Sequence, residues 1–259
     1  MTIKSFKNVY QAFGLTIASE LPIPELIPTS SNHIDVVIEN GDLYATWLEQ
    51  FEKDEYYKIK PNWLMMHVPE VAIFCIENGN KIIASPFNES EEDEIRLFLL
   101  GTCMGALLMQ RKIIPLHGSA IEIDGKAYAI LGDCGAGKST LAKAFLNRGY
   151  KLLADDITAV TFSNKQEPLV IPGYPQQKLW MESLNNFQLE SNQFNPLVDR
   201  GKKFSVPAVS QFVNEKLPLA GIYELFITDS DEITITPVRN MDRFHTVFNQ
   251  TFRNYFLEE

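Results

Sequence analysis

The chain has 259 residues, of which 45% are hydrophobic, and a formal net charge of −10. This length and composition can bury one large core or two smaller ones. The sequence is acidic overall and has no cluster of basic residues, so we expect no nucleic-acid partner. No apolar run is long enough to cross a bilayer, so we also expect no membrane contact. The three cysteines lack the spacing of a disulfide framework or zinc site, which favours a cytoplasmic location.

Residues 1–88 are predicted to form a β-rich N-terminal domain. Asn78-Gly79 suits a hairpin turn with positive φ. The prolines of "ELPIPELIP" remove backbone donors, which predicts an extended connector. Short runs of β-branched and aromatic residues predict the strands, in "HIDVVIENG", "YYKIKPNWLMMHV", "VAIFCIENGN" and "KIIAS".

Residues 89–259 are predicted to form a second domain. It begins with a helix from about Ser90 to Arg111, for which Ser90 and Asp93 resemble a capping pair. Two strands joined by Asp124-Gly125 follow, and the second strand leads directly into a glycine-rich loop.

Beyond that loop, "STLAKAFLNRG" predicts a helix that stops at Gly149, and "YKLLA" predicts a strand. We expect a loop-rich polar stretch at residues 173–203, a strand pair near 221–237 and a last helix from about Met241. The sequence therefore predicts an α/β protein in which a β-rich N-terminal domain precedes a P-loop domain built on a mixed sheet.

The glycine-rich loop fits the phosphate-binding pattern G-x-x-x-x-G-K-[ST]. Glycines let backbone N–H groups approach phosphate oxygens, and the following helix adds its positive N-terminal end. Lys138 would meet the β- and γ-phosphates of ATP, and the Ser139 hydroxyl would bind Mg²⁺. The cysteine inside the loop is a reactive thiol or, as we favour, a spacer. The expected nucleotide-binding residues are Gly132, Asp133, Cys134, Gly135, Ala136, Gly137, Lys138, Ser139 and Thr140.

Two aspartates, Asp155 and Asp156, follow the loop lysine at a spacing that accommodates one helix and one strand. Adjacent residues at a strand end point in different directions. One carboxylate can therefore face Mg²⁺ while the other orients an acceptor hydroxyl and takes its proton. The alternative is that the pair caps a turn, as aspartates at strand ends often do. His117, in "PLHGS", is by itself more typical of packing or of a surface position.

The segment "LHGSAIEIDGKAYAILGDCGAGKSTLAKAFLNRGYKLLADDITAV" resembles the catalytic domain of HPr kinase/phosphorylase. That family has a His-Gly, a strand pair, a phosphate loop, a helix and an Asp-Asp pair in the same order, in a fold shared with phosphoenolpyruvate carboxykinases, and it phosphorylates a protein serine. The resemblance implies that Asp156 is the general base and that Asp155 lies near the metal. It puts His117 at the phosphoryl-transfer site, so the expected catalytic residues are Asp156, His117 and Lys138. A homo-oligomer is possible, because HPr kinases form hexamers.

The resemblance has departures after the aspartate pair. In "LVIPGYPQQKLW", Val170 and Pro172 replace charged residues of the family. With "YQAFGLTIASELPIPEL" and "GKKFSVP", this stretch looks more like the HPr-kinase-like proteins of lasso peptide biosynthesis, which phosphorylate the C-terminal serine of a precursor peptide. That reading makes Lys178 and Lys203 substrate-binding cations, the alternative being solvated surface lysines.

We therefore expect an ATP- and Mg²⁺-dependent kinase that acts on a serine hydroxyl of a peptide or protein. Three alternatives stay open: an HPr-type protein serine kinase, a small-molecule kinase and a nucleotide-sensing module without catalysis. A sensing module would need Lys138 and Ser139 but not Asp156, so the aspartate pair favours an enzyme.

Overall fold

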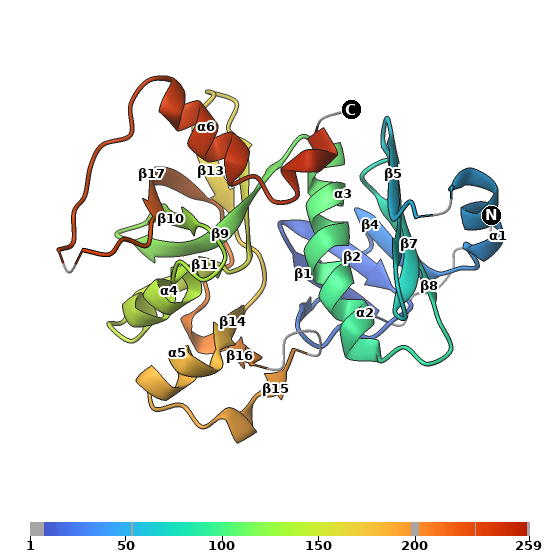
Figure 1. Ribbon diagram of the computed structural model, residues 1–259, viewed down its shortest axis with the longest axis horizontal. Coiled ribbons are helices and arrows are strands. Elements are labelled where there is room, and N and C mark those ends of the chain that lie inside the picture. The colour runs from blue at the N-terminus through green and yellow to red at the C-terminus, as the bar shows by residue number, and fades with distance from the viewer. Residues whose placement is uncertain (1–7, 53, 198–201, 231, 258–259) are drawn as a thin grey trace.

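The computed structural model describes residues 8–52, 54–197, 202–230 and 232–257 (Figure 1). A β-rich N-terminal part and a part that carries the phosphate loop lie on either side of a long helix (Figure 1). This arrangement confirms the predicted α/β class, with a β-rich N-terminal part followed by a P-loop part on a mixed sheet. No helix in the described ranges is long and apolar enough to cross a membrane.

The N-terminal part is an eight-stranded sheet of order β3-β1-β2-β4-β8-β7-β6-β5. Alternate side chains of its central strands pack on opposite faces, as the two-residue period of a strand requires. Met65, Ile73 and Cys75 pack with Trp47 of the helix α1 (Tyr44–Gln50). The strands are β1 (Asn8–Ala12), β2 (Leu15–Ser19), β3 (Ile27–Pro28), β4 (Val36–Asn40), β5 (Tyr57–Lys60), β6 (Trp63–Val68), β7 (Ala72–Glu77) and β8 (Lys81–Pro86).

The predicted helix after the sheet is confirmed, but its start differs from the prediction. It comprises α2 (Glu92–Phe98), a π-helical segment η1 (Leu99–Cys103) and α3 (Met104–Gln110). The Ser90 hydroxyl donates to the carbonyl of Phe87 instead of capping the helix, so the capping-pair prediction was wrong. Buried residues of this helix belong to the same apolar cluster as the opposite face of the N-terminal sheet. The domain division at residues 88 and 89 stays a prediction.

The second part is built around β9 (Ile114–Ile123), which pairs with three strands. Its first half pairs with β12 (Ile157–Phe162), and its second half pairs with β10 (Lys126–Gly132) and β11 (Lys151–Ala154). The β9–β10 hairpin turns at Asp124 and Gly125, both at positive φ, as predicted. A parallel strand, β17 (Leu217–Leu225), and β13 (Pro168–Ile171) complete a six-stranded sheet. The helix α4 (Lys138–Leu146) follows the loop, and Gly149 lies just beyond its end at φ +93°.

The stretch 173–203 is not loop-rich in its described residues. β14 (Gln176–Trp180), β15 (Asn195–Pro196) and β16 (Lys203–Pro207) form a three-stranded sheet, and α5 (Met181–Asn186) follows β14. Four apolar residues scattered through a polar sequence bury together and stabilise this unit: Leu179, Leu184, Phe204 and Val206. The prediction failed because the pairing partner of β14 lies far along the chain. A short 3₁₀ helix, η2 (Ser191–Gln193), lies between α5 and β15, and another, η4 (Val209–Gln211), follows β16.

The strand pair expected near 221–237 is only half present. β17 ends at Leu225, and the described residues between it and α6 (Met241–Asn249) include neither strand nor helix. Ile233 and Ile235, in the run expected to form the second strand, are 95% and 80% exposed. This run pairs with no strand among the described residues. The last helix is confirmed, and a 3₁₀ helix η5 (Asn254–Leu257) follows it.

Gly118 on β9 provides a test of how closely the two strands beside the loop pack. A Cβ at this position would overlap the carbonyl oxygen of Ile130 and the Leu131 side chain, so Gly118→Ala should lose about 1–3 kcal/mol of unfolding free energy. Urea unfolding measures the loss. In Gly101→Ala the added methyl meets nothing within 4 Å, and removing a helical glycine should leave stability unchanged or raise it by up to about 1 kcal/mol. Equal stability of the two variants would contradict this packing.

Candidate active site

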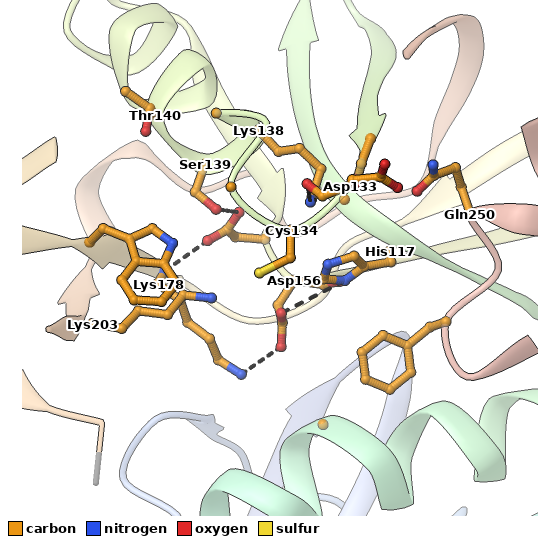
Figure 2. Close-up of a pocket in the computed structure, with 18 of the residues that line it drawn as sticks. His117, Asp133, Cys134, Lys138, Ser139, Thr140, Asp156, Lys178, Lys203 and Gln250 are labelled. Atoms are coloured by element: carbon orange, nitrogen blue, oxygen red, sulfur yellow. Dashed lines mark hydrogen bonds and ion pairs between the residues drawn. The ribbon is translucent and has the colours of Figure 1, made fainter. Parts of the chain in front are cut away.

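A cavity of about 770 Å³ lies between the phosphate loop and the long helix. Its lining residues come from the loop, from the middle of β9 at His117, from the aspartate pair just after β11, from β14, from the α2–η1 helix and from the segment after α6, among others. Among the described residues, it therefore brings every chemically active side chain that the sequence singled out into one space (Figure 2).

The phosphate loop joins β10 to α4. Gly132, Gly135 and Gly137 adopt φ values of +138°, +87° and +93°, a region in which residues with a Cβ are strained. The Lys138 ammonium donates to the carbonyl oxygens of Gly132 and Asp133 at 2.8 and 2.9 Å, which keeps the charge over the loop. Burial lowers the pKa of Lys138. The loop thus combines a glycine-dependent backbone at the N-terminus of α4 with a buried cation, and a polyphosphate site requires both.

The Thr140 hydroxyl, at the first turn of α4, lies 2.7 Å from the Ser183 hydroxyl of α5. Cys134 is exposed at the tip of the loop, while Ala136 donates its N–H to the Asp133 carbonyl at 3.1 Å. The Thr140 contact joins the start of α4 to α5, and the exposed Cys134 lines the cavity.

Asp155 is a buried carboxylate held by three donors. One oxygen accepts from the Ser119 hydroxyl at 2.5 Å and from the Ser139 hydroxyl at 2.8 Å, and the other accepts from the Lys178 N–H at 2.7 Å. Burial raises the pKa of Asp155, and these hydrogen bonds offset part of that effect. Sequence analysis missed Ser119, although its position two residues after His117 on the same strand was a usable signal.

Asp156 faces the other way because its backbone lies in the left-handed region, at φ +73°. Its carboxylate forms an ion pair with the Lys178 ammonium at 2.6 Å, and Figure 2 shows this pair beside His117. Burial opposes ionisation of Asp156, but the charges of Lys178 and Lys203 outweigh it and hold the pKa of this carboxyl below its usual range. Asp156 is therefore an ionised hydrogen-bond acceptor at neutral pH.

His117 lies next to this carboxylate. Its Nδ1 is 3.2 Å from the backbone oxygen of Asp156 and 3.9 Å from the carboxylate. Because a carbonyl oxygen only accepts, the proton is on Nδ1, and Nε2 is left as an acceptor. Burial lowers the pKa of His117, so the imidazole is neutral at physiological pH.

The two lysines proposed to bind substrate differ in their surroundings. Lys178 lies on β14 rather than in a loop and is 7% exposed; its backbone N–H bonds Asp155 and its ammonium bonds Asp156. Lys203, at the start of β16, is half-buried with its ammonium 5.7 Å from the centre of the Trp180 ring. Neither lysine is a freely solvated surface residue in this structure.

The residues around Asp155 also fit a magnesium ion. Among the described residues, no cluster of three or more His, Cys, Asp or Glu could hold a metal by itself. However, the hydroxyl of Ser139 and the carboxylate of Asp155 are hard oxygen donors 2.8 Å apart beside the loop. Mg²⁺ is commonly bound by one or two such protein ligands together with phosphate oxygens and water.

Sequence comparison relates part of the chain to HPr kinase/phosphorylases. A protein of that name from Lactobacillus gasseri is 31% identical over 100 residues, covering 35% of this chain and 31% of the relative. One from Enterococcus faecalis is 32% identical over 117 residues, covering 44% of this chain and 34% of the relative. The matched region spans about a third of the length of these relatives. No family model matches the chain.

Structural comparison gives a weaker relation. The Hpr(Ser) kinase/phosphatase from Coxiella burnetii aligns over 48% of this chain and 71% of its own, at 16% identity and a TM-score of 0.29. A score of this size does not establish a shared fold. The sequence similarity to HPr kinase/phosphorylases thus stands beside the site geometry as a separate observation.

The Lys178–Asp156 ion pair gives a stability prediction. Lys178→Met and Asp156→Asn should each lose about 3 kcal/mol of unfolding free energy in urea, because each leaves its partner charge buried without compensation, and the double variant should lose clearly less than the sum. Since the folded pKa of Asp156 is depressed, its contribution is present above the unfolded value of about 4 and is lost as the pH falls further. Additive losses in the double variant would mean that the pair is not coupled.

Proposed function

We propose that this protein is a kinase that transfers the γ-phosphoryl group of ATP, with Mg²⁺, to a serine hydroxyl of a peptide or protein. The observation that supports it most is the shared cavity: the phosphate loop, the Ser139–Asp155 pair and the ionised Asp156 all line it. A phosphate site alone would suit a nucleotide sensor, but an ionised carboxylate beside it suits proton transfer from an acceptor.

In this proposal the loop N–H groups and Lys138 bind the β- and γ-phosphates. Ser139 and Asp155 would hold Mg²⁺, which neutralises developing charge on the phosphates when bound. The serine oxygen forms a bond to the γ-phosphorus as the bond to the β-phosphate oxygen breaks, and the hydroxyl proton goes to Asp156. Because its pKa is low, Asp156 first orients the hydroxyl and takes the proton late, when the attacking oxygen has become acidic.

Three further residues support this chemistry. Lys178 keeps Asp156 ionised and in place through the 2.6 Å ion pair. Lys203 and the neutral His117 line the same cavity, where Lys203 can offset phosphate charge and Nε2 of His117 can accept a hydrogen bond. Transfer is therefore assigned to Asp156, His117 and Lys138, with Lys178 and Lys203 on the substrate side.

The acceptor is proposed to be the C-terminal serine of a lasso peptide precursor. This finer assignment is supported by the resemblance of "PGYPQQKLW" and "GKKFSVP" to the kinases of lasso peptide biosynthesis and by the uncharged Val170 and Pro172. The partial similarity to HPr kinase/phosphorylases supports a serine acceptor but leaves HPr itself as the alternative. The cytoplasmic location and a homo-oligomeric state stay predictions.

A transfer assay with Asp156→Asn tests the proposal. Wild-type protein with Mg²⁺ and ATP should add about 80 Da to the terminal serine of a lasso-type precursor peptide, read by mass spectrometry. Asp156→Asn should slow transfer roughly 10²–10⁴-fold, because it removes the proton acceptor, and nucleotide binding should remain. Transfer to HPr rather than to the peptide would show that HPr, not a lasso precursor, is the acceptor. ATP binding without transfer to either acceptor would contradict the proposed serine kinase activity.

Ser119 provides a separate test of the magnesium assignment. Ser119→Ala removes the 2.5 Å hydrogen bond to Asp155 and should weaken Mg²⁺-dependent nucleotide binding roughly tenfold to hundredfold, as does the loss of a group that hydrogen-bonds a metal ligand. The measurement is fluorescent ATP binding titrated with Mg²⁺. Thr158→Val removes a nearby buried hydroxyl that bonds the Gly118 carbonyl instead, and it should leave the Mg²⁺ titration unchanged. Equal effects in both variants would argue against Asp155 as a ligand.

A further inference from the structure

The cavity has a second wall that faces the phosphate loop. On one side it is formed by the α2–η1 helix, through Leu97, Phe98, Gly101 and Thr102. On the other it is formed by the segment after α6, which crosses from the P-loop part to the long helix (Figure 1). A cavity with the nucleotide loop on one wall leaves the opposite wall for the acceptor.

The segment after α6 is fixed against the site by backbone hydrogen bonds. The His117 N–H donates to the Gln250 carbonyl at 2.6 Å, and the Phe252 N–H donates to the Pro115 carbonyl at 2.7 Å. The Phe252 ring lies 5.8 Å from the His117 ring and fits over Gly105 of α3, where a Cβ would overlap it. The second wall therefore has a defined position relative to the proposed transfer site.

Arg253 is the cation of this wall. Its guanidinium lies 5.7 and 6.0 Å from the ring centres of Phe252 and Tyr255, and its Nη1 donates to the Tyr255 hydroxyl at 3.0 Å. No carboxylate of the described ranges pairs with it, although the chain carries a net charge of −10. Its backbone also adopts φ +55°, a strained conformation for a residue of this size. The exposed Arg253 thus presents a guanidinium close to two rings, and only one of its N–H groups is engaged by the Tyr255 hydroxyl.

The remaining side chains of this wall are suited to a peptide. Leu97, Phe98, Phe252 and Tyr255 offer apolar and aromatic surface. Gly101 has open space where a Cβ would be, which gives room for a backbone to approach. The Thr102 hydroxyl is without a hydrogen-bond partner among the residues that the structure describes. Nucleotide phosphates, by contrast, have their donors on the opposite wall.

We propose that Arg253 binds a carboxylate of the acceptor peptide, one that lies beside the serine to be phosphorylated. This inference rests on the proposed kinase function. A guanidinium has five N–H donors, and with Nη1 bonded to Tyr255 the others can form a two-point contact with a carboxylate. The carboxylate comes from the peptide's own C-terminus or from an acidic side chain next to the serine.

Three versions of one precursor peptide separate these sources. The first ends in serine with a free carboxylate, the second ends in serine carboxamide, and the third ends in Asp-Ser-carboxamide. Binding is measured by calorimetry and transfer by mass spectrometry, both with wild-type protein. We expect the free carboxylate to bind roughly tenfold to hundredfold more tightly than the carboxamide, the effect of one charged hydrogen-bonded contact. Recovery in the third peptide would assign the contact to a side-chain carboxylate, and no recovery would assign it to the C-terminus.

Variants of Arg253 test the residue itself. Arg253→Gln keeps the backbone strain unchanged and should bind all three peptides equally weakly, while ATP affinity stays as in wild type. Arg253→Lys keeps the positive charge but lacks the two-point donor geometry of a guanidinium, and it should recover part of the preference for the peptide with a carboxylate. Arg239→Gln removes an exposed arginine outside the cavity and should change nothing. Circular dichroism checks that each variant is folded.

Several results would overturn the inference. One is equal binding of the three peptides by wild-type protein, another is no binding of any of them, and a third is an effect of Arg253→Gln on ATP rather than on peptide. Transfer to all three peptides at equal rates would support the kinase function and rule out the carboxylate contact. Carboxylate-dependent binding without transfer would support the carboxylate contact and contradict the kinase function.

Discussion

The site depends on one buried carboxylate, that of Asp155. It joins strand β9 through Ser119, the phosphate-loop helix through Ser139 and strand β14 through the Lys178 N–H. A buried carboxylate with raised pKa is costly unless donors surround it, so the three elements are held where their donors converge. The register of β14 follows from this, because the residue whose N–H bonds Asp155 is the residue whose ammonium reaches Asp156.

The two adjacent aspartates acquire opposite electrostatic character from this arrangement. Asp155 points toward hydroxyl and backbone donors, and burial raises its pKa. Asp156 is turned by its left-handed backbone toward Lys178 and His117, and the surrounding cations outweigh burial and lower its pKa. Two carboxylates with pKa values pushed apart by their surroundings are typical of sites in which one supports a ligand and the other handles a proton.

The parts predicted from sequence are those set by local patterns. The Asp124-Gly125 hairpin, the phosphate loop, α4 and the aspartates at a strand end each depend on residues a few positions apart. The failures lie where a distant partner decides. Lys178 was expected in a loop because the strand that pairs with it, β16, comes after a polar stretch, and the expected second strand near residue 235 has a strand pattern but no partner among the described residues. Ser119 gave a weak signal because the carboxylate it bonds comes from another element. The place of Arg253 in the cavity depends on how the segment after α6 is bonded to β9, which no local pattern shows.

His117 shows why packing and function need not be alternatives. The β9 residues around it are bonded to β12 on one side, where His117 pairs with Ile157, and to the segment after α6 on the other, through Gln250 and Phe252. The same short run of strand therefore fixes the distance between the aspartate pair and the second wall of the cavity. A shift of β9 would move both the group proposed to take the proton and the wall proposed to hold the acceptor, because the half-buried imidazole lies beside both, 3.9 Å from the Asp156 carboxylate and 5.8 Å from the Phe252 ring centre.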